Sequence, residues 1–302
     1  MITRRNLLAA AAALPFMRID VTAGAEAAPI TRPIPSSGEA LPVIGMGSSR
    51  TFDVSPDDAM MGQLTEVVRL FFAGGGAMID SSPMYGQAES TLGAVLQQLG
   101  MPESLFAATK VWTYGADAGI EQMRESSRRM NVPAFDLMQI HNLRDWKLHL
   151  PTLRRWKEEG KIRYLGITTS HQRNHAELEE IMRTEPLDFV QFSYNIENRL
   201  AEERLLPISA DRGIATIINR PFQRGALFSR SSGQPLPPLA KELGCESWGQ
   251  FYLKWIIGHP AVTCLIPATS KPKHMRDNMG ANFGPVPDAA QRAEMLKIFE
   301  SL

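Results

Sequence analysis

The sequence predicts an α/β protein built around one (β/α)8 TIM barrel. First, short apolar runs alternate eight times with helical segments along most of the 302 residues. Near-continuous apolar strands are typical of a parallel sheet that is buried on both faces. Second, Asp80, Tyr85, Lys110 and His141 end or follow successive apolar runs. The carboxyl ends of the strands are where such barrels carry their active sites. Alternation alone also fits an open, doubly wound sheet, so the polar strand ends are needed to favour the barrel.

The chain elements follow in order. Residues 30–48 contain prolines and a Ser-Ser-Gly turn, which predict an N-terminal hairpin that leads into the first barrel strand. The later strands are expected at residues 77–80, 105–110, 136–141, 162–168, 187–193, 214–219 and 262–267.

Helices are expected between these strands, and several of them end at a glycine, the residue that most readily stops a helix. Residues 220–238 are rich in Pro, Gly and Ser, which predicts a long loop over the barrel mouth. The helical segments are residues 57–73, 89–99, 118–130, 150–159, 175–184, 201–212, 247–257 and 271–279, with an extra C-terminal helix at 288–301.

The composition is that of an ordinary globular protein, with 44% apolar and 21% charged residues. Its length suits a single barrel, which typically needs about 250 residues. Lys+Arg and Asp+Glu both number 32. No basic tract is interleaved with aromatic residues, so nucleic-acid binding is not expected.

Residues 1–27 are expected to form a signal peptide, which leaves residues 28–302 as the barrel domain. Arg4 and Arg5 precede an Ala-rich apolar run, and Ala23-Gly24-Ala25 offers a small-residue cleavage site. The arginine pair resembles a twin-arginine export signal. The run is shorter than the ~20 residues of a membrane span, so no stable membrane insertion is expected. The protein is therefore expected to be periplasmic or secreted, with the twin-arginine export machinery as a partner. The alternative is a disordered start with two chance arginines.

Few residues suggest a metal or redox centre. The two cysteines, Cys245 and Cys264, lie in no CxxC motif. Whether they pair is left open, and two unpaired structural cysteines are the favoured interpretation. His171 and His175 are four residues apart, but no third ligand accompanies them. No metal is expected.

The four polar strand-end residues suit proton transfer to a carbonyl. A tyrosine with a pKa near ~10 is a poor acid at neutral pH. The Lys110 ammonium is expected to lower the pKa of Tyr85, and Asp80 is expected to hold Lys110 charged and in place. His141 is then expected to orient a carbonyl oxygen beside the phenol.

Three segments carry these residues: residues 80–86 (Asp-Ser-Ser-Pro-Met-Tyr-Gly), ATKVW and MQIHN. In this order they resemble the signature segments of the aldo-keto reductase superfamily. The resemblance extends from about Ile30 to the C-terminus. It implies a barrel in which Asp80, Tyr85, Lys110 and His141 are the catalytic tetrad. It also implies a nicotinamide cofactor that lies extended across the barrel mouth. A Rossmann site is not indicated, because no G-x-G-x-x-G follows a strand.

The same resemblance implies the cofactor-binding residues. GITTS and VQFSYN match the segments that hold the nicotinamide carboxamide, and NRPFQRGAL matches the loop beside the nicotinamide and the pyrophosphate. IPATSKPKHMRDN matches the segment that binds the adenosine and its phosphate. The implied residues are Thr168, Thr169, Gln191, Asn219, Pro221, Phe222, Thr269, Ser270, Lys271, Asp277 and Asn278.

This chain departs from the family pattern in several places. Asn219 stands where an aromatic residue often stacks on the nicotinamide, and Thr169 replaces the usual asparagine. Ala268 and His274 stand where the family offers basic residues. Lys271 and its basic neighbours are close enough in sequence to compensate, so NADP(H) is expected, with NAD(H) as the alternative.

The substrate is expected to be a small, apolar or flat carbonyl compound, because aromatic residues gather at the predicted mouth. The candidate pocket residues are Thr51, Phe52, Met84, Trp112 and Trp146.

The sequence thus predicts an NAD(P)H-dependent oxidoreductase that interconverts an aldehyde or ketone and an alcohol, with Tyr85 as general acid and base. A nicotinamide-binding sensor or accessory module with little turnover remains the alternative, because a fold does not fix a function. A barrel enzyme of different chemistry, such as a lyase, is a third possibility.

Overall fold

Eight parallel strands form one sheet in which each strand is hydrogen-bonded to its neighbour in the chain. The computed structural model describes residues 28–302, so the predicted signal peptide lies outside the described residues. Isolated bridges join Ile44 to Leu265 and Gly47 to Ala268, which brings the first and last strands together and confirms the barrel. The strands are β3 (Met46–Gly47), β4 (Met78–Asp80), β5 (Phe106–Val111), β6 (Phe135–His141), β7 (Ile162–Thr168), β8 (Phe189–Ser193), β9 (Ala215–Asn219) and β10 (Cys264–Leu265).

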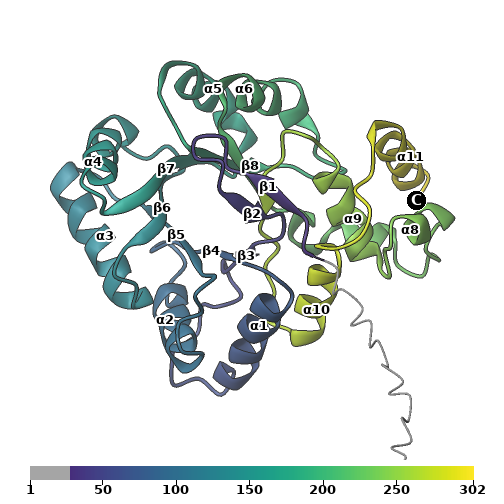
Figure 1. Cartoon of the computed structure of the whole chain (residues 1–302), viewed down its shortest axis with the longest axis horizontal. Coiled ribbons are helices and arrows are strands. Elements are labelled where there is room, and N and C mark those ends of the chain that lie inside the picture. Colours follow the sequence, from purple (N-terminus) through teal and green to yellow (C-terminus); the bar gives the residue numbers. More distant parts are fainter. Residues whose placement is uncertain (1–27) are drawn as a thin grey trace, which may run out of the picture.

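Helices surround the sheet in a ring (Figure 1). The principal helices of this ring are α1 (Met61–Ala73), α2 (Ala88–Gln98), α3 (Ala116–Met130), α4 (Trp146–Glu158), α5 (His175–Thr184), α6 (Leu205–Arg212), α9 (Trp248–Ile257) and α10 (Pro272–Gly280). The remaining helical segments are α7 (Leu227–Arg230), α8 (Pro238–Glu242), α11 (Ala289–Glu300), η1 (Gln172–Asn174), η2 (Leu200–Glu202) and η3 (Gln223–Gly225).

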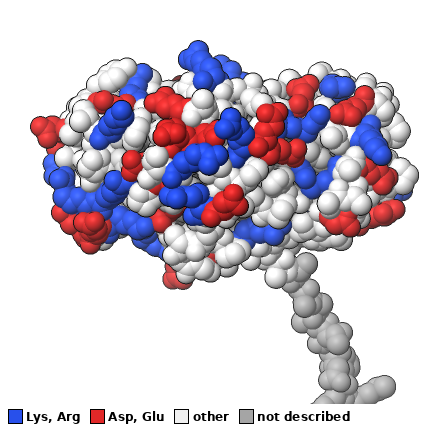
Figure 2. Space-filling view, turned by 90° about the horizontal axis from the view of Figure 1, so that it is seen from above, with Lys and Arg blue, Asp and Glu red and all other residues white. Residues whose placement is uncertain are grey.

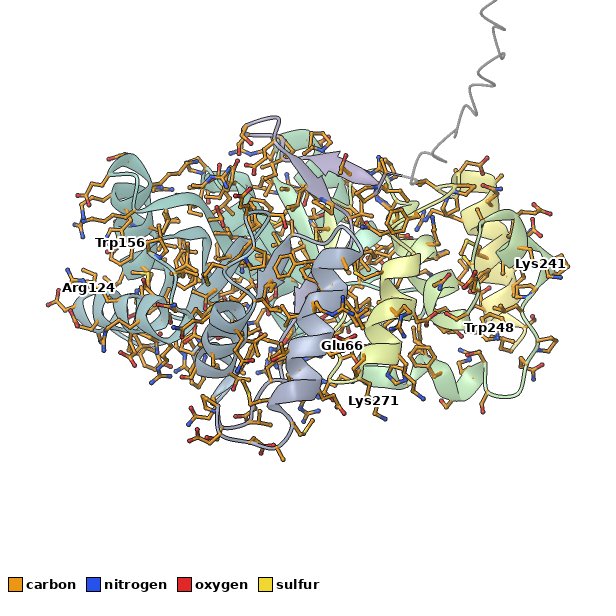
Figure 3. The ribbon with its side chains drawn as sticks, turned by 60° about the horizontal axis from the view of Figure 1, so that its bottom comes forward. Glu66, Arg124, Trp156, Lys241, Trp248 and Lys271 are labelled. Atoms are coloured by element: carbon orange, nitrogen blue, oxygen red, sulfur yellow. The ribbon has the colours of Figure 1, made fainter. Side chains whose placement is uncertain are left out.

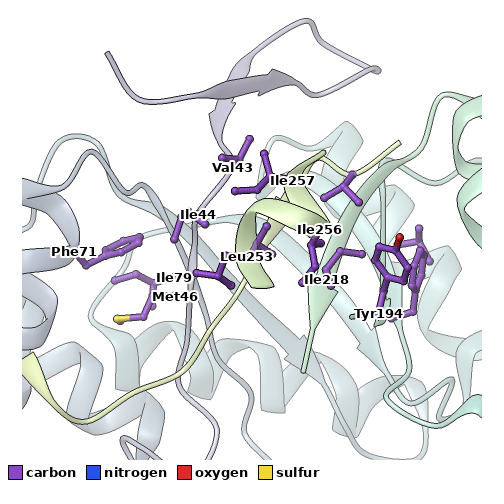
Figure 4. Packing of buried hydrophobic residues seen from close by; sticks show 14 of the residues in the cluster. Val43, Ile44, Met46, Phe71, Ile79, Tyr194, Ile218, Leu253, Ile256 and Ile257 are labelled. Carbon is purple, nitrogen blue, oxygen red and sulfur yellow. The ribbon is translucent and has the colours of Figure 1, made fainter. Parts of the chain in front are cut away.

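The strands alternate between an outward face and a barrel interior, as the period of two requires. Outward residues such as Ile79, Ile140 and Ile218 are fully buried against the helices. Figure 4 shows this outer core between the sheet and helices α1 and α9, where Phe71 and Leu253 face the strands. The helices therefore derive much of their stability from an apolar layer on the outside of the barrel.

The interior changes character along the strands. Near their amino ends the inward residues are apolar, as at Phe106, Leu137 and Phe189. Two and four positions further on, the same face carries Lys110, Gln139 and other polar side chains. The lower half of the barrel is thus a packed plug, and the polar residues are concentrated near the carboxyl-end mouth.

The predicted N-terminal hairpin is present as β1 (Thr31–Pro33) and β2 (Ala40–Pro42), which pair antiparallel. It lies across the barrel in the axial view (Figure 1). Ile34 and Leu41 of the hairpin join the apolar residues of the lower interior. The hydroxyl of Tyr164 donates to Glu39 Oε2 at 2.5 Å and lies 2.8 Å from Ser37 Oγ. The hairpin therefore closes the end of the barrel that is opposite the mouth.

Several elements differ from the sequence prediction, among them α6, which begins at Leu205 instead of residue 201. Helix α1 begins at Met61 instead of residue 57, because Asp58 accepts from the Met60 amide at 2.8 Å and forms a turn before the helix. Helix α4 begins at Trp146 instead of residue 150 and continues through Pro151. The predicted loop at 220–238 contains the short helices η3 and α7, where the ring centroids of Phe222 and Phe228 lie 5.0 Å apart.

The outer surface carries both signs of charge. Figure 2 shows Lys and Arg interspersed with Asp and Glu on the face that it draws. Several of these residues form ion pairs within or between elements, such as Arg69 with Glu66 and Lys157 with Asp188. Within residues 28–302, no helix combines the length and the apolar character needed to cross a bilayer.

Candidate active site

Asp80 and Lys110 form a buried ion pair at the polar end of the barrel interior. Lys110 Nζ donates to Asp80 Oδ2 at 2.6 Å and to the Ser81 carbonyl at 2.7 Å. The two residues are 1% and 0% exposed. Such a pair needs further hydrogen bonds to offset the loss of hydration. Gln139 and Gln191 supply them, since both donate to Asp80 Oδ1, at 2.8 and 3.2 Å.

Tyr85 lies over this pair, in the loop that follows β4. Its ring centroid is 5.1 Å from Lys110 Nζ. The loop turns tightly, because the Tyr85 amide donates to the Ser82 carbonyl at 2.9 Å. The strand end and the turn together bring the phenol to the mouth beside the ammonium group.

The pKa of Tyr85 is raised, contrary to the expectation from the sequence. Burial raises it more than the Lys110 charge lowers it. For Lys110, burial alone would lower the pKa, but Asp80 and Tyr85 outweigh burial and raise it. The site therefore holds Lys110 as an ammonium and Tyr85 as a neutral phenol, which can donate a proton or a hydrogen bond.

His141 is brought beside Tyr85 by the end of β6. The two rings lie 5.7 Å apart and nearly perpendicular, at 89°. His141 is buried, and its Nδ1 is 2.8 Å from Ser82 Oγ. Burial, followed by the charges of Lys110 and Arg144, lowers the pKa of His141 well below its usual value.

Ser82 can hold His141 in the tautomer that carries its ring proton on Nε2. Ser82 Oγ already accepts from the Met84 amide at 3.2 Å. Its own proton is thus free to be donated to Nδ1 of the neutral imidazole. Nε2 then carries the ring proton and is the donor that His141 can offer to a bound carbonyl oxygen.

A hydrogen-bonded network extends from Asp80 across the adjoining strands. Gln191 Nε2 donates to Gln139 Oε1 at 3.0 Å, and Asn219 Nδ2 donates to Gln191 Oε1 at 3.3 Å. Ser193 Oγ donates to Asn219 Oδ1 at 2.6 Å. This network connects Asp80 and Lys110 with the end of β9, where Asn219 is half-buried.

The residues implied for the nicotinamide gather along this network, but at different depths. Thr168, Thr169 and Gln191 are nearly inaccessible, at 1%, 0% and 2% exposed. Thr169 Oγ1 accepts from the His171 amide at 3.1 Å. Asn219 and Phe222 retain partial exposure, whereas Pro221 is buried. Among the implied residues on β7, β8 and β9, Asn219 is thus the one that the structure leaves open to a ligand.

Cationic side chains accumulate above the network. Arg220 follows Asn219, is half-buried and donates to Ser170 Oγ at 3.0 Å. Its pKa is lowered by burial first, then by the charge of Arg224, with a smaller lowering by Arg50. Within residues 28–302, none of these three arginines has a carboxylate within ion-pair distance. Uncompensated arginines at a barrel mouth suit a phosphate-bearing ligand.

The segment implied for the adenosine phosphate begins helix α10. Thr269 Oγ1 accepts from the Lys271 amide at 3.0 Å, and the Ser270 carbonyl accepts from Gln63 at 2.7 Å. Lys271 is exposed where α10 begins (Figure 3). The charge of Arg276 lies near Glu66. The pKa of Glu66 is lowered, by Arg69 first and by Arg276 less strongly. Lys271 is therefore better placed than Arg276 to meet an anion.

Asp277 and Asn278 have structural contacts in α10. Asp277 accepts from Ser247 Oγ at 2.8 Å and from Gln250 Nε2 at 2.9 Å, which ties α10 to the start of α9. Asn278 is buried. A carboxylate has acceptor sites for more than two donors, so these contacts still leave Asp277 able to accept from a base.

The candidate substrate residues divide into two groups. Met84 is 41% exposed, and Trp112 lies 6.5 Å from His141 and is half-buried. Thr51 and Trp146 also retain exposure, and Trp146 donates to Glu177 at 3.2 Å. Phe52 is instead fully buried in the outer apolar core. It therefore does not line the mouth, because its ring is buried against other apolar side chains.

Sequence reasoning missed several residues of the site. Gln139 precedes His141 by two positions on the inward face of β6, and Ser82 follows Asp80 by two. The alternation of inward residues would have identified Gln139. Nothing in the sequence indicates that Ser82 reaches His141, since this contact joins residues that are distant along the chain.

The cysteines are unpaired, as the sequence interpretation favoured. Cys245 and Cys264 are both free and buried. Burial raises the pKa of both thiols, to about 11 and about 12. Among the described residues, no group of three or more His, Cys, Asp or Glu side chains is arranged to hold a metal ion.

Comparisons with known proteins agree with this geometry. The curated relatives that match include an uncharacterized oxidoreductase of Schizosaccharomyces pombe, 31% identical over 165 residues, and an aldo-keto reductase of Bacillus subtilis, 26% identical over 184 residues. The first match covers 53% of this chain and 51% of the relative, and the second covers 55% and 54%. The chain thus spans about half the length of the curated relatives it matches.

Solved structures show the same fold. An aldo/keto reductase from Klebsiella pneumoniae, in complex with NADP and acetate, has a TM-score of 0.72 and 20% identity and covers 87% of this chain and 93% of its own. The aldo-keto reductase AKR11C1 from Bacillus halodurans has a TM-score of 0.72 and 21% identity and covers 90% and 96%. The model of the family described as "Aldo/keto reductase family" matches residues 43–293, so this chain belongs to the aldo/keto reductase family.

Proposed function

We propose that this protein is an NAD(P)H-dependent oxidoreductase that interconverts an aldehyde or ketone and the corresponding alcohol. The observation that carries the proposal is the convergence of Tyr85, His141 and the buried Asp80–Lys110 pair at the polar mouth of the barrel. These groups have the chemistry for moving a proton to and from a carbonyl oxygen. Family membership supports the assignment.

Each residue has a defined task in the reduction. The nicotinamide cofactor supplies the hydride when it is bound. His141 donates from Nε2 to the substrate oxygen and orients it. Tyr85 then gives its phenolic proton to that oxygen as negative charge develops, and the adjacent Lys110 ammonium stabilises the phenolate that remains. Asp80 keeps Lys110 charged throughout, and the same groups act in reverse in the oxidation direction.

The residues present fit a nicotinamide nucleotide. Asn219 offers an accessible amide at the end of the buried network, and the arginines at the mouth suit the pyrophosphate. Lys271, exposed where α10 begins, suits a 2′-phosphate, for which a charge-assisted contact is expected. The Klebsiella pneumoniae structures hold NADP with acetate and NADPH. We therefore infer that NADP(H) is preferred and that NAD(H) is the weaker alternative.

The test is steady-state oxidation of NADPH and of NADH with a panel of aldehydes and ketones, using the chain from residue 28 onward. Turnover that depends on the carbonyl compound is expected. Tight binding of the nucleotide without turnover would instead identify a sensor or accessory module. Lack of any nucleotide binding would point to different barrel chemistry.

We also propose that the protein is exported by a twin-arginine pathway, on the basis of Arg4, Arg5 and the Ala-rich run that follows. Such systems recognise the arginine pair and not only its charge, so changing both residues to lysine should retain the protein in the cytoplasm. Cell fractionation and the mass of the mature chain would measure this. Efficient export of the Lys-Lys variant, or a leader that is never cleaved, would contradict the proposal.

A further inference from the structure

The loop between β6 and α4 holds an arginine beside the reacting centre. Three of its residues, Asn142, Leu143 and Asp145, have left-handed backbone conformations, with φ of 55°, 58° and 51°. This conformation is uncommon and costly for residues other than glycine, and it is often found at functional sites. The turn lets the Arg144 amide donate to the His141 carbonyl at 3.2 Å. The turn therefore fixes the backbone of Arg144 close to that of His141, three residues before it in the chain.

The guanidinium of Arg144 lies against two aromatic rings instead of an acid. Its central carbon is 4.2 Å from the ring centroid of Trp112 and 4.7 Å from that of Tyr114. Ring contacts attract the charge but leave the in-plane N–H groups without acceptors. Within residues 28–302, its side chain donates no hydrogen bond to protein, and no carboxylate lies within ion-pair distance of it.

The rings of Trp112 and Tyr114 form an aromatic platform, and hydrogen bonds from neighbouring elements hold the segment that carries it. The Trp112 amide donates to Gln122 Oε1 at 2.5 Å, and Gln122 Nε2 donates to the Trp112 carbonyl at 3.2 Å. His149 Nε2 is 3.0 Å from the Thr113 carbonyl. The Gly115 amide donates to Asp145 Oδ2 at 2.7 Å, which joins the two loops. Asp145, the acid next to Arg144, thus ties its own loop to the loop that carries Trp112.

This platform faces the proton-transfer residues. Trp112 is close to both residues: its ring centroid lies 4.2 Å from the central guanidinium carbon of Arg144 and 6.5 Å from the ring centroid of His141. The charge of Arg144 also contributes to lowering the pKa of His141. A substrate whose oxygen is held by His141 would thus extend along Trp112 and bring its far end to the guanidinium.

We propose that Arg144 binds a carboxylate on the substrate, so that the preferred carbonyl compounds are aldehydes or ketones with a flat body and a terminal carboxylate. The proposal rests on the proposed function. The planar fork of a guanidinium matches the two oxygens of a carboxylate, and an arginine whose charge lacks an acid partner favours an anion. Trp112 supplies an apolar surface for the body of the molecule. Arg144 is then a specificity residue and not a catalytic one.

A matched pair of substrates tests the proposal: 4-carboxybenzaldehyde and its neutral methyl ester, with NADPH. In Arg144→Met, kcat/KM for the carboxylate should fall on the order of 10- to 100-fold, mainly through KM, while the ester changes by no more than about twofold. Arg144→Lys should be intermediate, because it keeps the charge and loses the fork. Arg124→Met is the control, since Arg124 is exposed on α3 and paired with Glu121 (Figure 3).

Equal losses for both substrates would overturn the proposal, since they would show that Arg144 only supports Trp112. Unchanged KM for the carboxylate would overturn it as well. Calorimetric measurement of the binding of 4-(hydroxymethyl)benzoate and of its methyl ester distinguishes failure of the Arg144 proposal from failure of the proposed function. Binding of the acid that is lost in Arg144→Met, without turnover of any aldehyde, would keep the anion site and reject the reductase. Turnover of aldehydes, together with binding of the acid that is not weakened in Arg144→Met, would keep the reductase and reject the anion site.

Discussion

At the residue scale, Tyr85 is acted on in opposite directions by burial and by a neighbouring charge. Burial holds the phenol neutral, and Lys110 lessens but does not reverse that effect. In the proposed reduction this balance would be useful, because Tyr85 must carry its proton before it can donate it. In the same proposal Lys110 would contribute most after proton transfer, when its charge would stabilise the phenolate.

Tyr85→Phe removes the transferable proton and should lower kcat for a reducible aldehyde by at least ~10²-fold, as expected for the loss of a general acid. Affinity for the nucleotide should be nearly unchanged, because the phenol is assigned to the carbonyl oxygen. Single-turnover kinetics and fluorescence titration with NADPH measure the two effects separately. Near wild-type turnover in this variant would show that the assigned role is wrong.

Lys271→Ala should narrow the difference in affinity between NADPH and NADH, because it removes the exposed cation at the start of α10. The wild-type protein should bind NADPH more tightly, and more so at low ionic strength. Titration of both cofactors at two salt concentrations measures this. Lys241→Ala provides a control, since Lys241 is exposed on α8 and is well separated from Lys271 in Figure 3. Equal affinities in the wild-type protein would contradict the expectation.

The sequence reveals these residues to different extents. Asp80, Lys110 and His141 can be identified because their chemistry coincides with the ends of apolar runs. Ser82 and Arg144 cannot, since their roles depend on turns with left-handed or bent backbones that local composition does not encode. Phe52 follows the first strand in the sequence, which suggests a pocket residue, but its ring is fully buried in the apolar core.

At the element scale, α2 and α3 pack so closely that a glycine is required between them. A Cβ at Gly93 of α2 would lie 2.0 Å from the Arg129 carbonyl oxygen of α3. Gly93→Ala should therefore lower the free energy of unfolding by ~1–3 kcal/mol, as overpacking does. Urea denaturation monitored by circular dichroism measures the change.

Gly62 in α1 is the matched control, because a Cβ there would meet nothing within 4 Å. Gly62→Ala should leave stability unchanged or raise it by up to ~1 kcal/mol, through better helix propensity. If both alanine variants shifted stability in the same direction, close contact between α2 and α3 would not be the cause.

Element boundaries show what local patterns can and cannot predict. Helix α5 spans the predicted residues 175–184, because its apolar spacing has no competing turn signal. Helix α4 starts earlier than its sequence predicts, since Pro151 resembles a first-turn proline but lies inside the helix. Pro151 has no N–H to donate to the carbonyl four residues earlier. The residue that carries this carbonyl is exposed, so water can donate a hydrogen bond to the carbonyl instead.

At the scale of the whole molecule, the histidines should make the fold sensitive to mild acid. Five of the six histidines have lowered pKa values, chiefly because of burial: His141, His171, His175, His259 and His274. A group with a lowered folded pKa contributes stability above its unfolded value near ~6.5 and loses it as pH falls towards the folded value.

For the buried His141, the free energy of unfolding should fall by about 1.4 kcal/mol for each pH unit below ~6.5, until its folded pKa is reached. Denaturation at several pH values between 7 and 5 measures the slope, and His141→Gln should reduce it. Glu125 and Glu159 have lowered pKa values and act at lower pH, whereas burial raises the pKa of Glu89, which adds stability as pH falls. The contribution of His141 is therefore the part of the slope that His141→Gln removes. An equal slope in the wild-type protein and in His141→Gln would contradict the prediction.

The barrel itself was predictable because each strand and helix carries its own pattern and neighbours in the chain are neighbours in the sheet. Closure of the sheet was not encoded locally, since it depends on contacts between residues near the two ends of the domain. The predicted strand at 262–267 shortens to two residues in β10, and bridges complete the remainder.

The seam where the barrel closes has a consequence for how the chain folds. The Gly45 amide donates to the Leu265 carbonyl at 2.8 Å, and the Leu265 amide donates to the Val43 carbonyl at 2.9 Å. A chain that emerges from the ribosome in order makes one side of this seam early and the other near the end. Until then β3 is an unpaired sheet edge, although a short one, which limits its use as a template for aggregation. The barrel can therefore close only after the residues around Leu265 have been made, and its closure depends on contacts that are far apart along the chain.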